Sequence, residues 1–386
     1  MPYNFDDVPN RRTTQLRNKW TWYPNDVLPM WVADMDFQSP KPIRDALHHY
    51  LDLGVMGYES PSKQLLEAVA ERMHRLYRWK ISEEMIVTLT GVNIGYNVAA
   101  RTFCRSRKQY LIQTPVYNEF HDTEKKTGVR EIESPLVKIV EGNRIRYEVD
   151  FDAFGKAARK ADLFLLCHPH NPIGHIYSPQ ELKQIAEICI KNDLIIVSDE
   201  IHSELLLGNA TFQPMASLAR EMANRTITLI SASKTFNVPG LFCAFAIIPN
   251  KQLREAYKET VFNMGIHISS AGLVAARVAY EGQCDSWLRS LRRYLTANRD
   301  WLVDAVTRHL PEVHITVPDS TYLAWLDFSA FKLKPSPFRF FLKEAKVALS
   351  DGRKFGKGSE QFVRINFGTS RKWLEEGFKR IKKALK

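Results

Sequence analysis

The sequence predicts an α/β protein with a large domain on a mostly parallel sheet and a smaller α+β domain. Two observations support this fold class. Between residues 86 and 248, short apolar runs alternate with stretches of helical period, which is typical of a parallel sheet with crossover helices. From about residue 269 this alternation ends, and a long helical stretch is followed by strands and further helices. The length of 386 residues suits two domains.

The N-terminal part shows little periodicity up to about residue 42, and helices are then expected at residues 45–53 and 62–79. The second of these helices has an apolar stripe at helical spacing, formed by Leu65, Leu66, Val69, Met73 and Leu76. A turn-rich connector separates the two helices at residues 54–61. The connector marks the entry into the alternating region.

Seven strands are expected in the alternating region, at residues 86–89, 109–113, 129–132, 163–167, 194–197, 226–230 and 243–248. Helices are expected between them at residues 93–103, 119–127, 151–159 and 179–191. The last of these helices follows Ser178, with Pro179 first and Glu181 third, which is the pattern of a capping box. The strand at 194–197 is apolar throughout, which suits a sheet covered on both faces.

The C-terminal part is expected to begin with one long helical stretch over about residues 271–310. Strands near residues 322–327 and 362–366 follow, with two further helices. The expected division is therefore an N-terminal segment at residues 1–44, the large domain at 45–275 and the small domain at 276–386.

Composition and charge restrict the classes of function. No apolar run reaches the length of a membrane span, and the first residues lack the basic and apolar parts of a secretory signal, so a cytoplasmic protein without a membrane partner is expected. The five cysteines form no CxxC pair, which argues against a disulfide framework and against a metal site. The net charge of +11 comes with no nucleic-acid-reading motif, so it favours an anionic substrate or cofactor over a nucleic acid.

A lysine loop follows the expected strand at residues 226–230. Lys234 lies there between Ser231 and Ser233 on one side and Gly240 on the other. A partly desolvated lysine can lose its proton and react as an amine with an aldehyde, and the two hydroxyl groups can donate to an anion. The alternative is a surface lysine between turn serines, and the motif alone leaves both interpretations open.

Polar residues also follow three other strands. Asp199 and Asn171 lie in the polar stretches that follow two strands, and Val92 and Asn93 open a helix after a third. Ligands of doubly wound sheets bind outside the carboxyl ends of the strands, and helix N-termini bind phosphate. The set fits a pyridine aldehyde phosphate: Lys234 for an imine, Asp199 to keep the ring nitrogen protonated, and the helix start for the phosphate.

Further motifs extend the pattern along the chain: PMWVADMDF (29–37), GY (57–58), TPVY (114–117), HNPIG (170–174), SDEIH (198–202), SKTFN (233–237), TYLAWLD (321–327) and RIN (364–366). With these motifs, the chain resembles the fold-type I pyridoxal phosphate enzymes of aminotransferase class I/II. Within that class it is similar to the cystathionine β-lyase (C–S lyase) branch of MalY/PatB-like proteins. The resemblance covers essentially the whole chain. It implies that the large domain binds the cofactor and that the N-terminal segment contributes to the small domain and the active site.

The resemblance implies a role for each matching residue around the cofactor ring. Lys234 is expected to be the catalytic residue, which carries pyridoxal 5′-phosphate as an imine and moves protons. Asp199 is expected to pair with the pyridine nitrogen. Asn171 and His202 are expected near the phenolic oxygen, and Tyr117 is expected to stack on the ring.

A second group of residues is implied for the phosphate. Val92 and Asn93 would give backbone N–H groups, and Ser231 and Ser233 would add hydroxyl groups. Tyr58 is expected to reach the phosphate of the neighbouring subunit, so the resemblance implies a homodimer with shared active sites.

Two residues are implied for the amino-acid substrate. Arg364 would hold its α-carboxylate in a bidentate pair, and Ala33 would add a backbone contact. Simpler interpretations stay open for several site residues: an edge aromatic for Tyr117, a core histidine for His202, a surface ion pair for Arg364 and a turn cap for Ser233.

Three departures from the family pattern concern substrate preference. Asn118 follows Tyr117 where many relatives have a second aromatic residue, and the phosphate loop reads GVNIG. No arginine follows Gly240, as it would in typical aminotransferases, which agrees with the lyase branch.

The function that we expect is α,β-elimination from S-substituted L-cysteines, with L-cystathionine as the type substrate and pyruvate, ammonia and a thiol as products. One alternative is transamination of amino acids on the same framework. Another is a regulatory protein that keeps the fold and binds a partner. Residue types do not separate elimination from transamination, because the difference lies in how the substrate is held.

Overall fold

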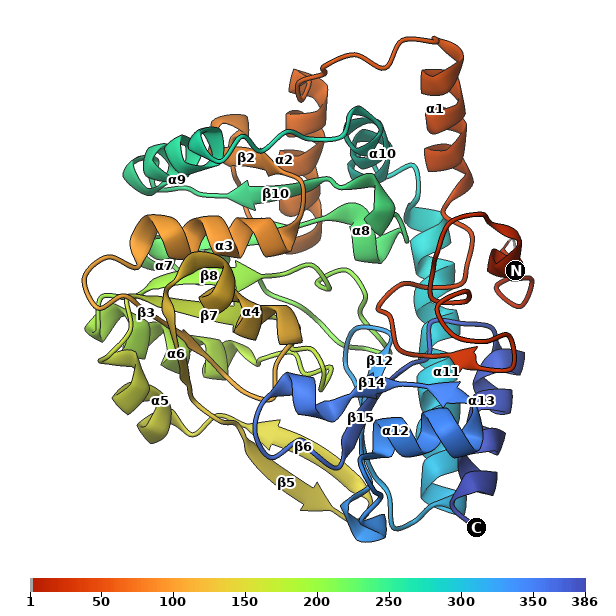
Figure 1. Ribbon diagram of the computed structural model, residues 1–386. Coiled ribbons are helices and arrows are strands. Elements are labelled where there is room, and N and C mark those ends of the chain that lie inside the picture. The colour runs from red at the N-terminus through yellow and green to blue at the C-terminus, as the bar shows by residue number, and fades with distance from the viewer. Residues whose placement is uncertain (1–2) are drawn as a thin grey trace.

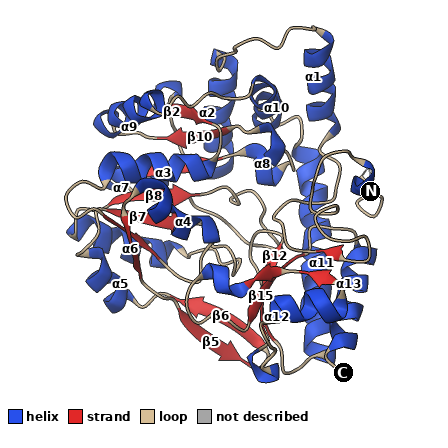
Figure 2. Cartoon of the chain, in the orientation of Figure 1, coloured by secondary structure: helices blue, strands red, loops and turns tan. Residues whose placement is uncertain are grey.

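The computed structural model describes residues 3–386 and contains two main sheets (Figures 1 and 2). The larger sheet has seven strands, which in spatial order are β2 (Ile86–Leu89), β10 (Ala244–Ile247), β9 (Thr226–Ile230), β8 (Ile195–Asp199), β7 (Leu163–Cys167), β3 (Gln109–Ile112) and β4 (Arg130–Glu133). β10 runs antiparallel to both of its neighbours, and all other adjacent pairs are parallel. The predicted fold class is confirmed.

Helices cover both faces of the seven-stranded sheet (Figure 1). The helices on one face are α3 (Val92–Phe103), α4 (Asn118–Thr127) and α9 (Lys251–Asn263), and those on the other are α5 (Phe151–Ala158), α6 (Pro179–Lys191) and α7 (Arg220–Arg225). Two helices beyond the β2 edge are α1 (Lys41–Asp52) and α2 (Lys63–Tyr77). The predicted capping box of α6 is present, with Ser178 and Glu181 bonded reciprocally.

The smaller sheet has six strands, in the order β14 (Ser350–Asp351), β15 (Phe362–Asn366), β12 (Leu323–Asp327), β11 (His314–Thr316), β6 (Arg144–Glu148) and β5 (Val137–Glu141). The C-terminal helices beside it are α11 (Asp285–His309), α12 (Pro337–Phe340) and α13 (Arg371–Ala384) (Figure 1). A short parallel pair joins β1 (Leu28–Pro29) to β13 (Val347–Ala348), so the N-terminal segment is tied to the C-terminal part of the chain.

The prediction of one helical stretch over residues 271–310 is wrong. Two helices occupy it, α10 (Ser270–Tyr280) and α11, separated near Gly282. Gly282 has a φ of +89°, a value that side chains disfavour, and a Cβ there would meet the guanidinium of Arg75. The apolar periodicity on both sides concealed the break, because one glycine only weakly opposes a helical pattern.

The strands β5 and β6 were missed. They form a hairpin around Gly142 and Asn143, and β6 pairs in parallel with β11 of the C-terminal part. Gly142 has a φ of +63°, as a two-residue hairpin turn requires. The Gly-Asn pair between alternating residues was the available signal, but many charged residues hid it. The domain boundaries near residues 44 and 275 stay predictions.

No helix within residues 3–386 combines the length and the apolar character needed to span a bilayer. The cytoplasmic location stays a prediction.

Candidate active site

A cavity of about 220 Å³ lies where β7, β8 and β9 end and α3 begins. Most residues predicted for the site line it: Ala33, Val92, Asn93, Tyr117, Asn171, Asp199, His202, Ser231, Ser233 and Lys234. Parallel strands present their carboxyl ends at one edge of a sheet, so residues far apart in sequence meet there. The structure thus brings these predicted residues together, while their individual roles stay predictions.

Lys234 lies on the short helix α8 (Ala232–Thr235), directly after β9. The hydroxyl of Ser231 caps this helix by accepting a hydrogen bond from the Ser233 N–H. The Lys234 Nζ donates to the Ala33 carbonyl at 2.8 Å. Desolvation in the cavity lowers the pKa of the Lys234 amine to about 8, although the carboxylate of Asp34 acts to raise it. Lys234 is therefore close to losing its proton near neutral pH.

Asp199 ends β8 and is 6% exposed. Its Oδ1 accepts one hydrogen bond, from the Ile201 N–H at 3.1 Å. Burial raises the pKa of the Asp199 carboxyl to about 7, while this N–H and the charge of Lys234 act to lower it. A cationic N–H placed against this carboxylate would stabilise its ionised form.

His202 and Asn171 lie on the cavity wall after β8 and β7. The His202 Nδ1 is buried and has no hydrogen-bond partner among the described residues, and burial lowers the pKa of its ring to about 3. The Asn171 Oδ1 accepts a hydrogen bond from the Arg364 Nη1 at 3.0 Å. A neutral imidazole and an amide therefore both face the cavity.

The first turn of α3 closes one end of the cavity. Gly91 is its N-cap and offers no side chain, while the Asn93 Oδ1 accepts a hydrogen bond from the Ile94 N–H at 2.9 Å. Val92 and Asn93 stand at its first positions, so their N–H groups have no carbonyl one turn earlier in the helix. The Ser231 hydroxyl donates to the Cys243 carbonyl at 2.7 Å, and would have to turn before it could donate to an anion.

Arg364 lies on β15 and does not line the cavity itself. Its guanidinium donates to Asn171, to the Trp31 carbonyl and to Ser350, all within 3.1 Å. Within residues 3–386 no carboxylate pairs with it, and its Nε has no partner. Burial lowers the pKa of Arg364 to about 10. A buried guanidinium with this surrounding is suited to bind an anion that enters from outside.

Tyr117 precedes α4 and packs edge-on against Phe120, with ring centres 6.3 Å apart. Tyr96 of α3 also lines the cavity, and its hydroxyl is buried without a partner in the described chain. Tyr322, before β12, donates to the same Ala33 carbonyl as Lys234, at 2.8 Å. The sequence analysis missed Tyr96 and did not assign Tyr322, although both belong to segments that it had placed near the site.

Tyr58 lies apart from the cavity. Its side chain is fully exposed on the connector between α1 and α2. Four exposed apolar side chains precede it in sequence: Leu51, Leu53, Val55 and Met56. The contact of Tyr58 with a neighbouring subunit stays a prediction.

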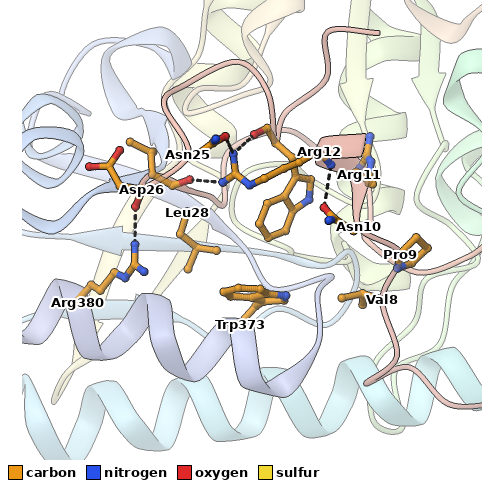
Figure 3. Close-up of a pocket in the computed structure, with 12 residues that line it drawn as sticks. Val8, Pro9, Asn10, Arg11, Arg12, Asn25, Asp26, Leu28, Trp373 and Arg380 are labelled. Atoms are coloured by element: carbon orange, nitrogen blue, oxygen red, sulfur yellow. Dashed lines mark hydrogen bonds between the residues drawn. The ribbon is translucent and has the colours of Figure 1, made fainter. Parts of the chain in front are cut away.

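A second hollow, of about 340 Å³, lies between the N-terminal segment and α13 (Figure 3). Its guanidinium groups already have partners: Arg12 donates to Asn25 and to the carbonyls of Trp20 and Val27, and Arg380 donates to the Asp26 carbonyl. We interpret this hollow as the seam along which the N-terminal segment is fastened to the C-terminal helix.

Comparisons with known proteins agree with this geometry. A sequence model described as "Aminotransferase class I and II" matches residues 32–381. Cystathionine beta-lyase PatB of Bacillus subtilis (strain 168) is 36% identical over 390 residues, covering 99% of this chain and 100% of the relative. A PLP-bound putative aminotransferase from Clostridium difficile 630 superposes with a TM-score of 0.94 at 33% identity, covering all of both chains. The PLP-bound C–S lyase of Staphylococcus hominis gives 0.91 at 30% identity, covering 99% of this chain and 98% of that one.

Proposed function

The chain belongs to the aminotransferase class I and II family, and from this premise we propose that it catalyses α,β-elimination from S-substituted L-cysteines, giving pyruvate, ammonia and a thiol. It is a pyridoxal phosphate-dependent enzyme of the cystathionine β-lyase-like type. The class of substrate that the enzyme prefers is part of this proposal.

The residues of the cavity fit this cofactor. The first N–H groups of α3, those of Val92 and Asn93, suit a phosphate, and within residues 3–386 the buried Asp199 carboxylate has no cationic hydrogen-bond partner. The partnerless Nδ1 of His202 adds a polar atom that a ligand can satisfy. When bound, pyridoxal phosphate supplies an electron-withdrawing ring that stabilises negative charge on the α-carbon of an amino acid.

We assign Lys234 the transfer of the α-proton. Its Nζ has to be a free amine to take a proton, and desolvation already brings its pKa to about 8. The Ala33 carbonyl holds the Nζ at 2.8 Å and can orient the amine within the cavity. Asp199 is assigned the cofactor nitrogen, where a carboxylate keeps an adjacent N–H protonated.

We assign Arg364 to the α-carboxylate of the substrate. The guanidinium is buried and has no carboxylate partner in residues 3–386, so an entering carboxylate would satisfy it. Asn171 accepts from Arg364 and lines the cavity, and thus joins the carboxylate site to the cofactor site. The amino acid would then lie between Arg364 and Lys234.

The observation that supports elimination most strongly is the full-length similarity to a cystathionine β-lyase at 36% identity. The test is to incubate the purified, cofactor-loaded protein with L-cystathionine and to measure pyruvate and free thiol. Both are expected in equal amounts. Their absence from a protein that has bound the cofactor would exclude this reaction. Lys138→Ala serves as the matched control, because Lys138 lies on β5 and pairs with Asp327 at 2.8 Å.

Transamination is the second candidate. It is favoured by the putative aminotransferase of Clostridium difficile, which superposes with the TM-score given above. The discriminating measurement is nitrogen exchange between a ¹⁵N-labelled amino acid and a 2-oxo acid. Exchange without pyruvate release from cystathionine would replace our proposal by this one.

We further propose a homodimer in which Tyr58 completes the phosphate site of the partner. The exposed apolar side chains around Tyr58 support an interface there. Mixing Lys234→Ala with Tyr58→Ala subunits, each inactive alone, would create hybrid dimers with one intact site. At equal mixing about a quarter of the sites should recover. No recovery after proven subunit exchange would refute the shared site.

A further inference from the structure

The Ala33 carbonyl is a shared acceptor in the cavity. The Lys234 Nζ and the Tyr322 hydroxyl both donate to it at 2.8 Å. The position of this one oxygen therefore affects two groups at the site. Ala33 belongs to the loop at residues 31–37, so whatever holds that loop also places the amine of Lys234.

Lys19 holds this loop from the N-terminal segment. Its side chain is 1% exposed. Its Nζ donates to the Asp34 carbonyl at 2.9 Å, and lies 2.9 Å from the Asp34 Oδ1 and 3.0 Å from the Asp36 Oδ1. Three oxygen atoms thus surround an ammonium that carries three protons. All three belong to residues that follow Ala33 within three positions.

The same cluster has further members. The Trp20 Nε1 donates to the Asp36 Oδ1 at 2.7 Å, and the Arg11 Nη2 lies 2.9 Å from the Asp34 Oδ2. Arg11 is the outer member, with 26% of its side chain exposed. On its other side, the N-terminal segment is bonded to α13 through Arg380, which donates to the Asp26 carbonyl (Figure 3). Lys19 therefore acts from a segment that is itself held in place.

Neutral hydrogen bonds support the loop from two other directions. Asn237, beyond α8, binds the backbone of Met35 and Phe37, and Asn366 of β15 donates to the carbonyls of Val32 and Asp34. These contacts fix the path of the backbone. Lys19, together with Arg11 at the outer side, places positive charge against the carboxylates of Asp34 and Asp36.

We propose that Lys19 is a positioning residue for Lys234: it fixes the loop whose Ala33 carbonyl receives the lysine amine, and it compensates the charge of Asp34 beside that amine. The inference rests on the role of Lys234 in the proposed function. The charged and titratable groups around Lys234 include Asp34, Asp199, Arg364 and His202, together with Tyr322 on the shared Ala33 carbonyl. Without Lys19, Asp34 keeps only Arg11 as a cationic partner and acts more strongly on Lys234.

The test compares Lys19→Met with the wild-type protein in two measurements. In the cofactor-loaded protein, the pH midpoint of the visible absorbance change is expected to move up by about half a unit to one unit, because an uncompensated carboxylate favours the protonated nitrogen. In the cofactor-free protein, amides of residues 31–37 are expected to exchange hydrogen faster. The kcat for pyruvate release should fall roughly tenfold or more with little change in KM.

Three variants complete the experiment. Lys19→Arg keeps the charge, so its pH midpoint should lie close to that of the wild type. Arg11→Met should raise the pH midpoint as Lys19→Met does, but by less. Lys138→Met removes a lysine paired with the buried Asp327 elsewhere, and should leave midpoint and loop exchange unchanged.

Unchanged midpoint and unchanged loop exchange in both Lys19→Met and Arg11→Met would overturn the inference. If Lys138→Met changed the pH midpoint and the loop exchange as much as Lys19→Met does, general destabilisation would explain both effects. That result would also overturn the inference. If the wild-type protein releases no pyruvate but these shifts occur, the elimination reaction fails and the positioning role stands. The exchange measurement needs no cofactor or substrate.

Discussion

Two lysines, Lys19 and Lys234, both contact the loop at residues 31–37, and their surroundings differ. Lys19 lies against two carboxylates and a carbonyl within 3.0 Å. Lys234 donates to a single carbonyl, and its desolvation is offset only by more distant carboxylates. A paired buried ammonium stabilises the fold, whereas an unpaired one costs free energy that a reaction can use. The difference separates a structural lysine from a reactive one.

The largest effect is expected from removing the reactive lysine. Lys234→Ala should lower the rate of pyruvate formation from cystathionine by at least about 10³-fold, because it removes the proton-transfer group. It should also remove the pH-dependent visible absorbance that this amine gives with bound cofactor. A residual rate within tenfold of the wild type would contradict the assignment.

A smaller effect, on stability, is expected at the structural lysine. Lys19→Met should lower the free energy of unfolding of the cofactor-free protein by about 3 kcal/mol, because it leaves Asp34 and Asp36 buried with one cationic partner fewer. Urea unfolding at a fixed protein concentration measures this change. A variant as stable as the wild type would show that the cluster does not stabilise the fold.

The opposite sign is expected for Lys234→Met. The folded pKa of about 8 lies below the ordinary 10.5, so folding penalises the protonated amine. This penalty is fully present below pH 8 and disappears as the pH rises to the unfolded value. The cofactor-free variant should therefore be more stable than the wild type by up to about 3 kcal/mol at pH 7, since one pKa unit corresponds to about 1.4 kcal/mol. The gap should close toward pH 10.5, and a gap independent of pH would exclude this cause.

The smallest effect is expected at the rim of the structural cluster. Arg11 pairs with Asp34 at 2.9 Å but is 26% exposed, so water screens the pair. Arg11→Met should lower the free energy of unfolding by about 1 kcal/mol, as measured by urea unfolding beside Lys19→Met. If Arg11→Met lost as much stability as Lys19→Met, burial would not determine how much each cation of the cluster contributes to stability.

Part of the site could be predicted from the sequence because it follows local patterns. Asp199 ends an apolar strand, Asn171 and Lys234 lie just beyond two others, and the parallel strands bring such positions to one edge. Arg364 was predicted from the resemblance, and the structure buries it against Asn171 as a neighbour of the cavity.

Other features depend on contacts between distant parts of the chain. In the sequence, nothing distinguishes Lys19 from other lysines of an irregular segment. Its partners, Asp34 and Asp36, are known only from the folded structure. The hairpin of β5 and β6 lies inside the alternating region but completes a sheet with strands of the C-terminal part, where Ile315 lies opposite Arg144.

The sequence by itself determined the fold class, the family and the strand-end residues, because periodicity and short motifs are local properties of the chain. The tertiary structure decided which lysine is neutralised by close carboxylates and which donates to a carbonyl with no carboxylate close by. Charge and hydrogen bonding depend on distances of a few ångströms between segments, and those distances exist only once the N-terminal segment, β9 and β15 are folded against one another.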